Sequence, residues 1–207
     1  MKKIISLKNI SYVINQKIII DDVSLDVNSN EIVALRGPNG AGKTTLLKLM
    51  YGLTSPTSGI ITKSYNSEMC SSFIFQNPNF LKDTVYQNLS HALYCKNIPK
   101  KDRRNKVASL LEKYSLDYLT DKYIHHLSGG ELQLVSLLRS LVIQPKIIFY
   151  DEPTNNLDEY NTNLILDIIQ TYINDNNQLI LVSHDDSFVD KLNCINITLR
   201  DGRVANA

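Results

Sequence analysis

The stretch GPNGAGKTT, Gly37 to Thr45, has the residue types and spacing that bind phosphate, because it matches G-x-x-x-x-G-K-[ST]. Glycines let backbone N–H groups close around phosphate oxygens, a lysine reaches the β- and γ-phosphates, and the next hydroxyl suits Mg²⁺. We therefore predict that Lys43 binds phosphate and that Thr44 binds both nucleotide and metal. The residues expected at the nucleotide are Gly37, Pro38, Asn39, Gly40, Ala41, Gly42, Lys43, Thr44 and Thr45.

Two adjacent carboxylates end the apolar stretch KIIFYDE, which is typical of a buried parallel strand. The carboxyl end of such a strand is where ligands bind in α/β proteins. We expect Asp151 to hold the metal and Glu152 to polarise an attacking water. In GTPases a different loop, with glycine nearby, usually follows the carboxylate, so the second acid favours an ATPase.

A histidine ends another apolar stretch, LILVSHD. A lone histidine is more often structural than catalytic. Here its strand is expected to neighbour the strand of Asp151, which would bring His184 within reach of the γ-phosphate.

The stretch HHLSGGELQL, His125 to Leu134, has the sequence of a second anion site. Ser128 and Glu131 form the pattern of a capping box at a helix start. Capping alone leaves Gly129 and Gly130 unexplained, since glycine costs about 1 kcal/mol relative to alanine inside a helix. Exposed N–H groups at a helix start bind anions, and glycine allows a close approach.

The elements that must position these residues alternate in type along the chain. Two β-rich stretches joined by Asn15-Gln16 predict an antiparallel sheet at the N-terminus, and CINITLRDGRV predicts a closing hairpin. The phosphate loop follows a strand and opens a helix that ends at Gly52. We predict one α/β domain over residues 1–207, a P-loop NTPase core with a parallel sheet, with an α-helical subdomain inserted at about residues 77–140.

The composition of the chain bears on three classes of function: nucleic-acid binding, metal binding by cysteines and membrane spanning. The 207 residues carry a formal net charge of +1, so bulk charge gives no indication of nucleic-acid binding. The three cysteines are far apart and have no metal-ligand spacing, which is typical of reduced thiols. No apolar run approaches the roughly 18 residues of a membrane helix, so we expect a soluble protein that meets a membrane only through a partner.

Together the motifs resemble the ATP-binding cassette family. The matching stretches are GPNGAGKTT, Gln76 in FIFQNPNF, LSGGE, KIIFYDEPT, NNLD and VSHD, in the family's order, and with Tyr12 they span nearly the whole chain. The resemblance implies paired subunits that enclose two ATP molecules, each between the phosphate loop of one subunit and the LSGGE of the other. Ser128, Gly129, Gly130 and Glu131 would then complete the partner's site.

The resemblance also assigns single residues. Tyr12 would stack on adenine, although it is also an ordinary tyrosine for a strand surface. Gln76 would sense Mg²⁺ and the attacking water. Asp158 would cross the dimer interface, and it is equally placed to cap the next helix. The chain departs from the family at Leu132-Gln133-Leu134, at Leu138-Arg139-Ser140 and at Tyr150, which raises the question of how this helix packs.

The function implied is an ATP-hydrolysing subunit that energises solute transport through a membrane permease. The permease would dock near Gln76–Leu81 and hold the subunit, as a homodimer or heterodimer, on the cytoplasmic face of the inner or cell membrane. A solute-binding protein would join the assembly in an importer. The alternatives are a regulatory or mechanical ATPase of this family without transport, such as a cell-division-type cassette, and a small-molecule kinase, for which we find no acceptor pocket or lid arginines.

Overall fold

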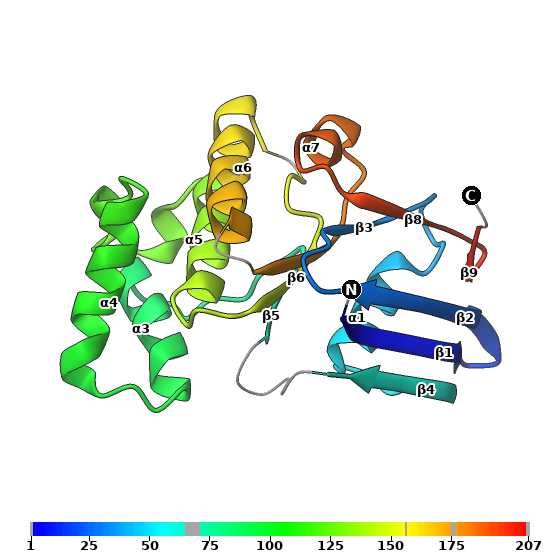
Figure 1. Cartoon of the computed structure of the whole chain (residues 1–207). Coiled ribbons are helices and arrows are strands. Elements are labelled where there is room, and N and C mark those ends of the chain that lie inside the picture. Colours follow the sequence, from blue (N-terminus) through cyan, green and yellow to red (C-terminus); the bar gives the residue numbers. More distant parts are fainter. Residues whose placement is uncertain (1, 65–70, 156, 175–176, 206–207) are drawn as a thin grey trace.

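The computed structural model describes residues 2–64, 71–155, 157–174 and 177–205, and Cys70, one of the three thiols, lies outside them. The strands are β1 (Lys3–Ile14), β2 (Lys17–Asn28), β3 (Val33–Arg36), β4 (Ser58–Lys63), β5 (Ser71–Ile74), β6 (Ile147–Asp151), β7 (Gln178–Val182), β8 (Ile195–Arg200) and β9 (Arg203–Val204). The helices are α1 (Lys43–Tyr51), α3 (Val85–Cys95), α4 (Lys100–Lys113), α5 (Gly129–Leu141), α6 (Glu159–Asn174) and α7 (Asp186–Lys191), with 3₁₀ turns at Asp117–Leu119 and Ile124–His126 (Figure 1).

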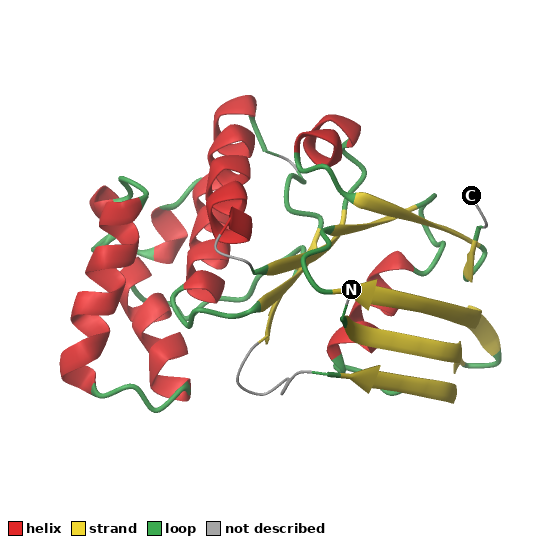
Figure 2. Ribbon diagram, in the orientation of Figure 1, coloured by secondary structure: helices red, strands yellow, loops and turns green. Residues whose placement is uncertain are grey.

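The N-terminal sheet is antiparallel with strand order β2-β1-β4 (Figure 2). Its first hairpin turns at Asn15 and Gln16, which both have the left-handed φ values, 48° and 64°, that a tight hairpin turn needs. This confirms the predicted hairpin. The strand β4 was not predicted from the sequence; it begins at Ser58, within the stretch SPTSG that predicts a turn, and is mostly exposed.

The second sheet has six strands in the order β5-β6-β7-β3-β8-β9. The pairs from β5 to β8 are parallel, and only β9 runs antiparallel, as the closing half of a hairpin. The strands β6 and β7 are adjacent, as predicted from their apolar sequences. Their carboxyl ends, at Asp151 and Val182, therefore lie side by side.

The six-stranded sheet has a separate hydrophobic cluster on each face. Along β6, Ile148 and Tyr150 join the cluster that contains residues of α3 to α7. Ile147 and Phe149 point to the opposite face and join the cluster formed with α1 and the N-terminal sheet. Successive strand residues point to opposite faces, so one buried strand supplies both clusters. The result is the predicted α/β architecture, with a parallel sheet between a helical layer and an antiparallel sheet (Figure 1).

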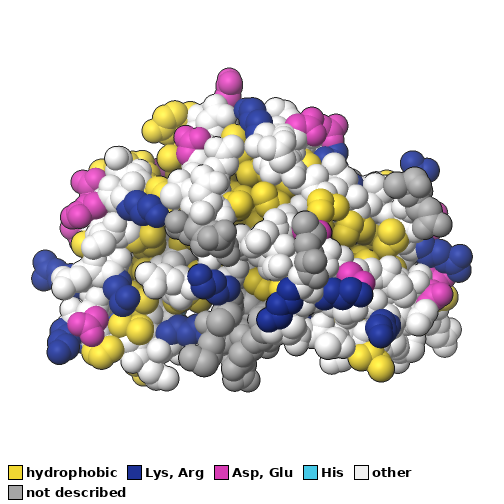
Figure 3. Space-filling view, viewed as in Figure 1, with side chains coloured by type: hydrophobic (Ala, Val, Ile, Leu, Met, Phe, Trp, Pro, Cys, Tyr) yellow, Lys and Arg dark blue, Asp and Glu magenta, His cyan; other side chains and the backbone are white. Residues whose placement is uncertain are grey.

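Between β5 and β6 the described chain forms helices and no strand of either sheet. The helix α3 contacts both α4 and α5, and the three helices stand apart from the N-terminal sheet (Figure 1). On the face shown in Figure 3, Lys and Arg side chains are interspersed with Asp and Glu, in keeping with a net charge of +1. None of the described helices combines the length and apolar character that crossing a membrane requires.

Candidate functional site

The phosphate loop joins β3 to α1, as predicted. Gly42 occupies the position before the helix with a left-handed φ of 98°, and a Cβ there would lie 2.8 Å from the carbonyl oxygen of Ile19. Glycine is therefore required both for the turn and for the approach of β2. The helix then runs from Lys43 to Tyr51 and ends at Gly52, whose N–H donates to the carbonyl of Lys48 at 2.9 Å.

Lys43 is buried at the start of α1 and its ammonium folds back over the loop. Its Nζ donates to the carbonyl oxygens of Gly37, at 2.8 Å, and Pro38, at 3.0 Å. Desolvation lowers the pKa of Lys43, and the nearby charges of Glu152 and Asp151 act in the opposite direction. The loop is thus closed around a cation.

Thr44 and Asp151 meet across the site. The hydroxyl of Thr44 donates to Oδ1 of Asp151 at 2.9 Å, although 107 residues separate them in sequence. Asp151 is buried, and this desolvation raises its pKa, while the hydrogen bond from Thr44 and the charges of Lys48 and Lys43 lower it. A hydroxyl and a carboxylate side by side are oxygen donors of the kind that Mg²⁺ prefers, so these residues fit the predicted metal.

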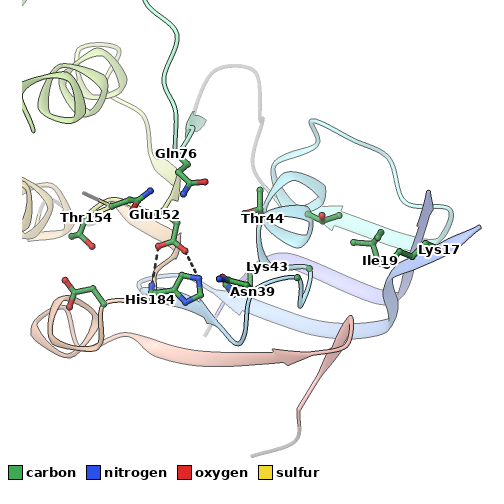
Figure 4. A pocket seen from close by; sticks show the side chains of 14 residues that line it. Lys17, Ile19, Asn39, Lys43, Thr44, Gln76, Glu152, Thr154 and His184 are labelled. Atoms are coloured by element: carbon green, nitrogen blue, oxygen red, sulfur yellow. Dashed lines mark hydrogen bonds and ion pairs between the residues drawn. The ribbon is translucent and has the colours of Figure 1, made fainter. Parts of the chain in front are cut away.

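Glu152 and His184 form the second contact of the site. Glu152 has a left-handed φ of 53°, and its N–H donates to the carbonyl of Val182 at 2.9 Å. Its carboxylate accepts from the backbone N–H of His184 at 3.3 Å and lies 3.2 Å from Nε2 of the same residue. The predicted proximity of the two strand ends is confirmed (Figure 4).

Lys43, Thr44, Glu152 and His184 line one cavity of about 790 Å³. Figure 4 shows Gln76, Glu152 and His184 on one side of Asn39, Lys43 and Thr44, and Lys17 and Ile19 on the other. The lining residues are Lys17, Ile19, Asn39, Gly40, Gly42, Lys43, Thr44, Thr45, Gln76, Glu152, Thr154, Asn155, His184 and Asp185. Sequence reasoning missed five of them. Thr154 and Asn155 follow the acid pair directly and could have been found from it, whereas nothing in the sequence marks Lys17 or Ile19.

Tyr12, the residue expected to stack on adenine, is not among those that line this cavity. Its ring packs partly buried against the cluster on α1 and the N-terminal sheet, and its hydroxyl accepts from Thr54 Oγ1 at 3.1 Å. The hairpin presents β2 to the cavity instead, through Lys17 and Ile19. The role of Tyr12 at adenine stays a prediction, and its hydroxyl is held by Thr54.

The LSGGE stretch forms the N-terminus of α5, away from the cavity. Ser128 caps the helix: its Oγ accepts from the N–H of Glu131 at 3.2 Å, and its own N–H donates to Oε2 of Glu131 at 2.9 Å. That backbone hydrogen bond from Ser128 is the main reason why the pKa of Glu131 is lowered. None of Ser128 to Glu131 lines the cavity, so a nucleotide there would not touch them within one chain.

The two glycines of this stretch have different surroundings. Gly129 is exposed, and a Cβ added to it would meet nothing within 4 Å. Gly130 is buried, and a Cβ there would collide with the side chain of Asn161 on α6. The sequence analysis explains both glycines by the close approach of a partner's phosphate. For Gly130, packing against Asn161 of its own chain is enough to explain why the residue is glycine.

Asp158 caps α6. Its Oδ1 accepts from the N–H of Asn161 at 2.8 Å and from Nδ2 of the same residue at 2.9 Å. The capping alternative for Asp158 is thus confirmed, while its exposed position leaves it accessible to a second chain. Since Asn161 also packs on Gly130, the starts of α6 and α5 are in contact.

The segment Gln76–Leu81 follows β5 and borders a second cavity of about 500 Å³, between β5, α3 and α5. Phe80 is partly buried against the core and Leu81 is 44% exposed. The residues that line this groove include Phe73, Phe80, Leu81, His91, Cys95 and Arg139. The groove is open and largely apolar, which suits a protein segment.

A model of the family described as ABC transporter matches residues 20–155. The chain is 38% identical over 162 residues to the Fe(3+) ions import ATP-binding protein FbpC of Mannheimia succiniciproducens, covering 73% of this chain and 46% of that protein. It is 35% identical over 191 residues to the lipoprotein-releasing system ATP-binding protein LolD of Buchnera aphidicola, covering 84% and 83%. The chain thus spans about half the length of FbpC and most of LolD.

The fold also matches a solved structure. The ATP-binding cassette MJ0796, in a dimeric post-hydrolysis state bound to ADP and Pi, superposes with a TM-score of 0.85 at 26% identity, covering 98% of this chain and 97% of the other.

Proposed function

The chain belongs to the ABC transporter family, and from this premise we propose that it binds and hydrolyses ATP to energise the transport of a solute through a membrane partner. The observation that carries the proposal is one cavity lined by Lys43, Thr44, Glu152 and His184. Asp151, at the carboxyl end of β6, accepts a hydrogen bond from Thr44 at the edge of this cavity. These are the parts that phosphoryl transfer needs: a phosphate cradle, metal ligands and a base.

The orientation of ATP follows from the chemistry of the lining. The phosphates occupy the loop from Gly37 to Thr45, where backbone N–H groups and Lys43 face them. The base then extends toward Lys17 and Ile19, which lie on the side of the cavity away from Glu152 (Figure 4). Ile19 offers the base an apolar surface there, and Tyr12, paired with the neighbouring Ile20, stays the aromatic residue proposed to stack on adenine.

Thr44, Asp151 and Gln76 are the residues proposed to hold Mg²⁺, which, when bound, neutralises charge on the phosphates. Glu152 accepts a proton from the attacking water. Because His184 contacts both carboxylate oxygens of Glu152, it fixes the plane of that carboxylate beside the γ-phosphate. His184 lines the same cavity and is proposed to contact the γ-phosphate as well.

A second subunit, identical or related, is needed because the LSGGE stretch does not reach its own cavity. Exposed Ser128 and Gly129 at the start of α5, with Gly130 and Glu131 behind them, are suited to the γ-phosphate of a nucleotide held by the partner. Asp158 is exposed beside them and lies in the same interface.

The proposed partner in the membrane is a permease that docks in the groove beside Gln76–Leu81. FbpC and LolD are named for import and for release, and both are ATP-binding subunits of transport systems. Docking to a permease would hold the chain on the cytoplasmic face of the membrane. We further propose that residues 1–207 act as one ATP-binding domain, with residues 77–140 as its helical part.

The experiment combines ATP turnover with light scattering on the purified full chain. We expect Glu152→Gln to lower phosphate release by about a hundredfold or more while ATP stays bound and a dimer accumulates. Adding Ser128→Arg to this variant should keep ATP binding and leave the protein monomeric, at a cost of about 1 kcal/mol from the lost cap. Failure of the unmodified chain to bind ATP would contradict the proposal as a whole. Rapid turnover by Glu152→Gln, or a dimer that persists with Ser128→Arg, would contradict the role of that residue.

A further inference from the structure

The turn between β8 and β9 contacts both the phosphate loop and β2. Asp201 and Gly202 form this turn, with left-handed φ values of 48° and 77°. The N–H of Gly202 donates to the carbonyl oxygen of Ala41 in the phosphate loop at 3.2 Å. The carbonyl oxygen of Gly202 accepts from the N–H of Asp21 in β2 at 2.9 Å. One buried glycine therefore bridges the phosphate loop and a strand of the other sheet.

The carbonyl oxygen of Ile19 in β2 lies close to two glycines. A Cβ on Gly202 would lie 2.6 Å from this oxygen, and a Cβ on Gly42 would lie 2.8 Å from it. Both distances are shorter than carbon and oxygen atoms reach without repulsion, so neither position has room for a side chain. The strand β2 thus packs between the phosphate loop and the turn, and its position depends on both.

A side-chain pair adds to this contact. Arg203 donates to Oδ2 of Asp21 from Nε at 2.9 Å and from Nη2 at 2.7 Å, and β9 lies beside β2 (Figure 1). The side chain of Arg203 is 71% exposed, and exposed ion pairs are weak. The backbone bonds of buried Gly202 therefore make the larger part of the attachment.

The strand held in this way carries the residues at one end of the nucleotide cavity. Lys17 and Ile19 of β2 line that end, and the phosphate loop lines the part next to it (Figure 4). Because β2 and the loop belong to different sheets, the distance between them depends on how the sheets are joined. Near the cavity the junction is at Asp21. At the other end of β2, Nε2 of Gln178 donates to the carbonyl oxygen of Asn28 at 2.7 Å.

The phosphate loop has hydrogen bonds of its own that do not involve the turn. The N–H of Ala41 donates to the carbonyl oxygen of Pro38 at 3.2 Å, and the N–H of Leu46 donates to that of Gly42 at 2.8 Å. Nζ of Lys43 donates to the carbonyl oxygen of Pro38 at 3.0 Å. Loss of the contact with the turn should therefore displace β2 more than it displaces the loop.

We propose that Gly202 and Arg203 are positioning residues for the nucleotide: by joining β2 to the phosphate loop, they set the distance between the surface for the base and the site for the phosphates. Neither residue lines the cavity. The inference rests on the proposed function in that it takes ATP as the ligand. A ligand that spans both ends of the cavity depends on their spacing, whereas a ligand confined to the phosphate loop does not.

The test compares ATP with inorganic triphosphate, which has the phosphates and lacks the nucleoside. Titration calorimetry with Mg²⁺ on the purified full chain measures the affinity for each. We expect Gly202→Ala to weaken ATP binding about tenfold and triphosphate binding less than about twofold, because alanine disfavours the left-handed φ and collides with β2. An equal loss for the two ligands, or no loss for either, would overturn the proposal.

Gly59→Ala is the matched control. Gly59 also has a left-handed φ, of 89°, and a Cβ there would lie 2.6 Å from the carbonyl oxygen of Lys8. It belongs to β4, which pairs with β1, and it does not line the cavity. The variant should be destabilised in a similar way and keep the ratio of ATP to triphosphate affinity within about twofold of the unmodified chain. A loss of this ratio as large as in Gly202→Ala would overturn the proposal, because general destabilisation would then explain both.

A milder variant tests the same junction if Gly202→Ala does not fold. Arg203→Met removes the ion pair and keeps the backbone bonds of the turn. It should weaken ATP binding about two- to threefold without changing triphosphate binding, and Arg203→Lys, which keeps a charged donor, should restore most of the affinity. An unchanged affinity for ATP in Arg203→Met would overturn the role of Arg203.

These readouts separate the inference from the proposed function, because they need ATP binding and no hydrolysis. A chain that shows the expected selective loss in Gly202→Ala but hydrolyses no ATP would support the inference and refute the function. A chain that hydrolyses ATP but loses affinity equally for ATP and triphosphate would support the function and overturn the inference.

Discussion

Gly130 at the start of α5 and Asn161 at the start of α6 are in contact so close that the glycine has no room for a Cβ. Asn161 is itself held by Oδ1 of Asp158, which accepts from its backbone and side-chain amides. The starts of α5 and α6 are thus packed against each other within a single chain.

This contact gives opposite expectations for two adjacent glycines. Gly130→Ala should lower the free energy of unfolding by about 1–3 kcal/mol, because it overpacks a tight contact. Gly129→Ala meets nothing within 4 Å and should leave stability unchanged or raise it by up to about 1 kcal/mol, since alanine favours the helix. Urea unfolding of both variants measures the difference, and equal stabilities would contradict the assigned contact.

The pairing of Thr44 with Asp151 predicts how the site responds to metal. Asp151→Asn removes a charged oxygen donor from the proposed Mg²⁺ site and leaves the phosphate loop intact. We expect ATP affinity without metal to be kept or increased, because one negative charge near the phosphates is gone. The gain in ATP affinity on adding Mg²⁺ should fall by about tenfold or more. Titration of ATP with and without a chelator measures both, and an unchanged response to Mg²⁺ would contradict the site.

Tyr150 predicts a pH effect on stability. Its hydroxyl is buried without a partner among the described residues, and desolvation raises its pKa above the ordinary value of 10.0. A raised folded-state pKa means that the folded chain favours the neutral form. Stability is therefore complete below pH 10 and declines as the pH rises from there toward the folded-state pKa.

Tyr150→Phe should remove that part of the alkaline decline. Near neutral pH it should also raise the free energy of unfolding by about 1 kcal/mol, because a desolvated hydroxyl without a bond is deleted. Unfolding curves at pH 7 and above pH 10 test both effects. Tyr172→Phe is the control, since its hydroxyl donates to the carbonyl of Pro145 at 3.0 Å and its loss should be destabilising at pH 7.

The sequence predicts the parts of this site that are formed by consecutive residues. The phosphate loop, the capping box of Ser128 and Glu131, and the acids that end β6 are local patterns whose geometry follows from the backbone. The adjacency of β6 and β7 also follows, because short apolar strands separated by a helix pair in parallel.

The contacts that sequence reasoning missed join residues far apart in the chain. Nothing local to Lys17 or Ile19 indicates that β2 passes the phosphate loop, and nothing local to Asn161 marks Gly130 as its neighbour. Tyr12 is assigned to adenine from the resemblance, and nothing local to it indicates that its hydroxyl bonds to Thr54.

The ammonium of Lys43 donates to the carbonyl oxygens of Gly37, at 2.8 Å, and Pro38, at 3.0 Å. An ammonium has three donors, so one is left for a phosphate oxygen while the two carbonyls keep the side chain in place. A nucleotide then gains a charge-assisted hydrogen bond from a lysine that folding has already oriented. Because the side chain and the loop are ordered beforehand, less conformational entropy is lost on binding.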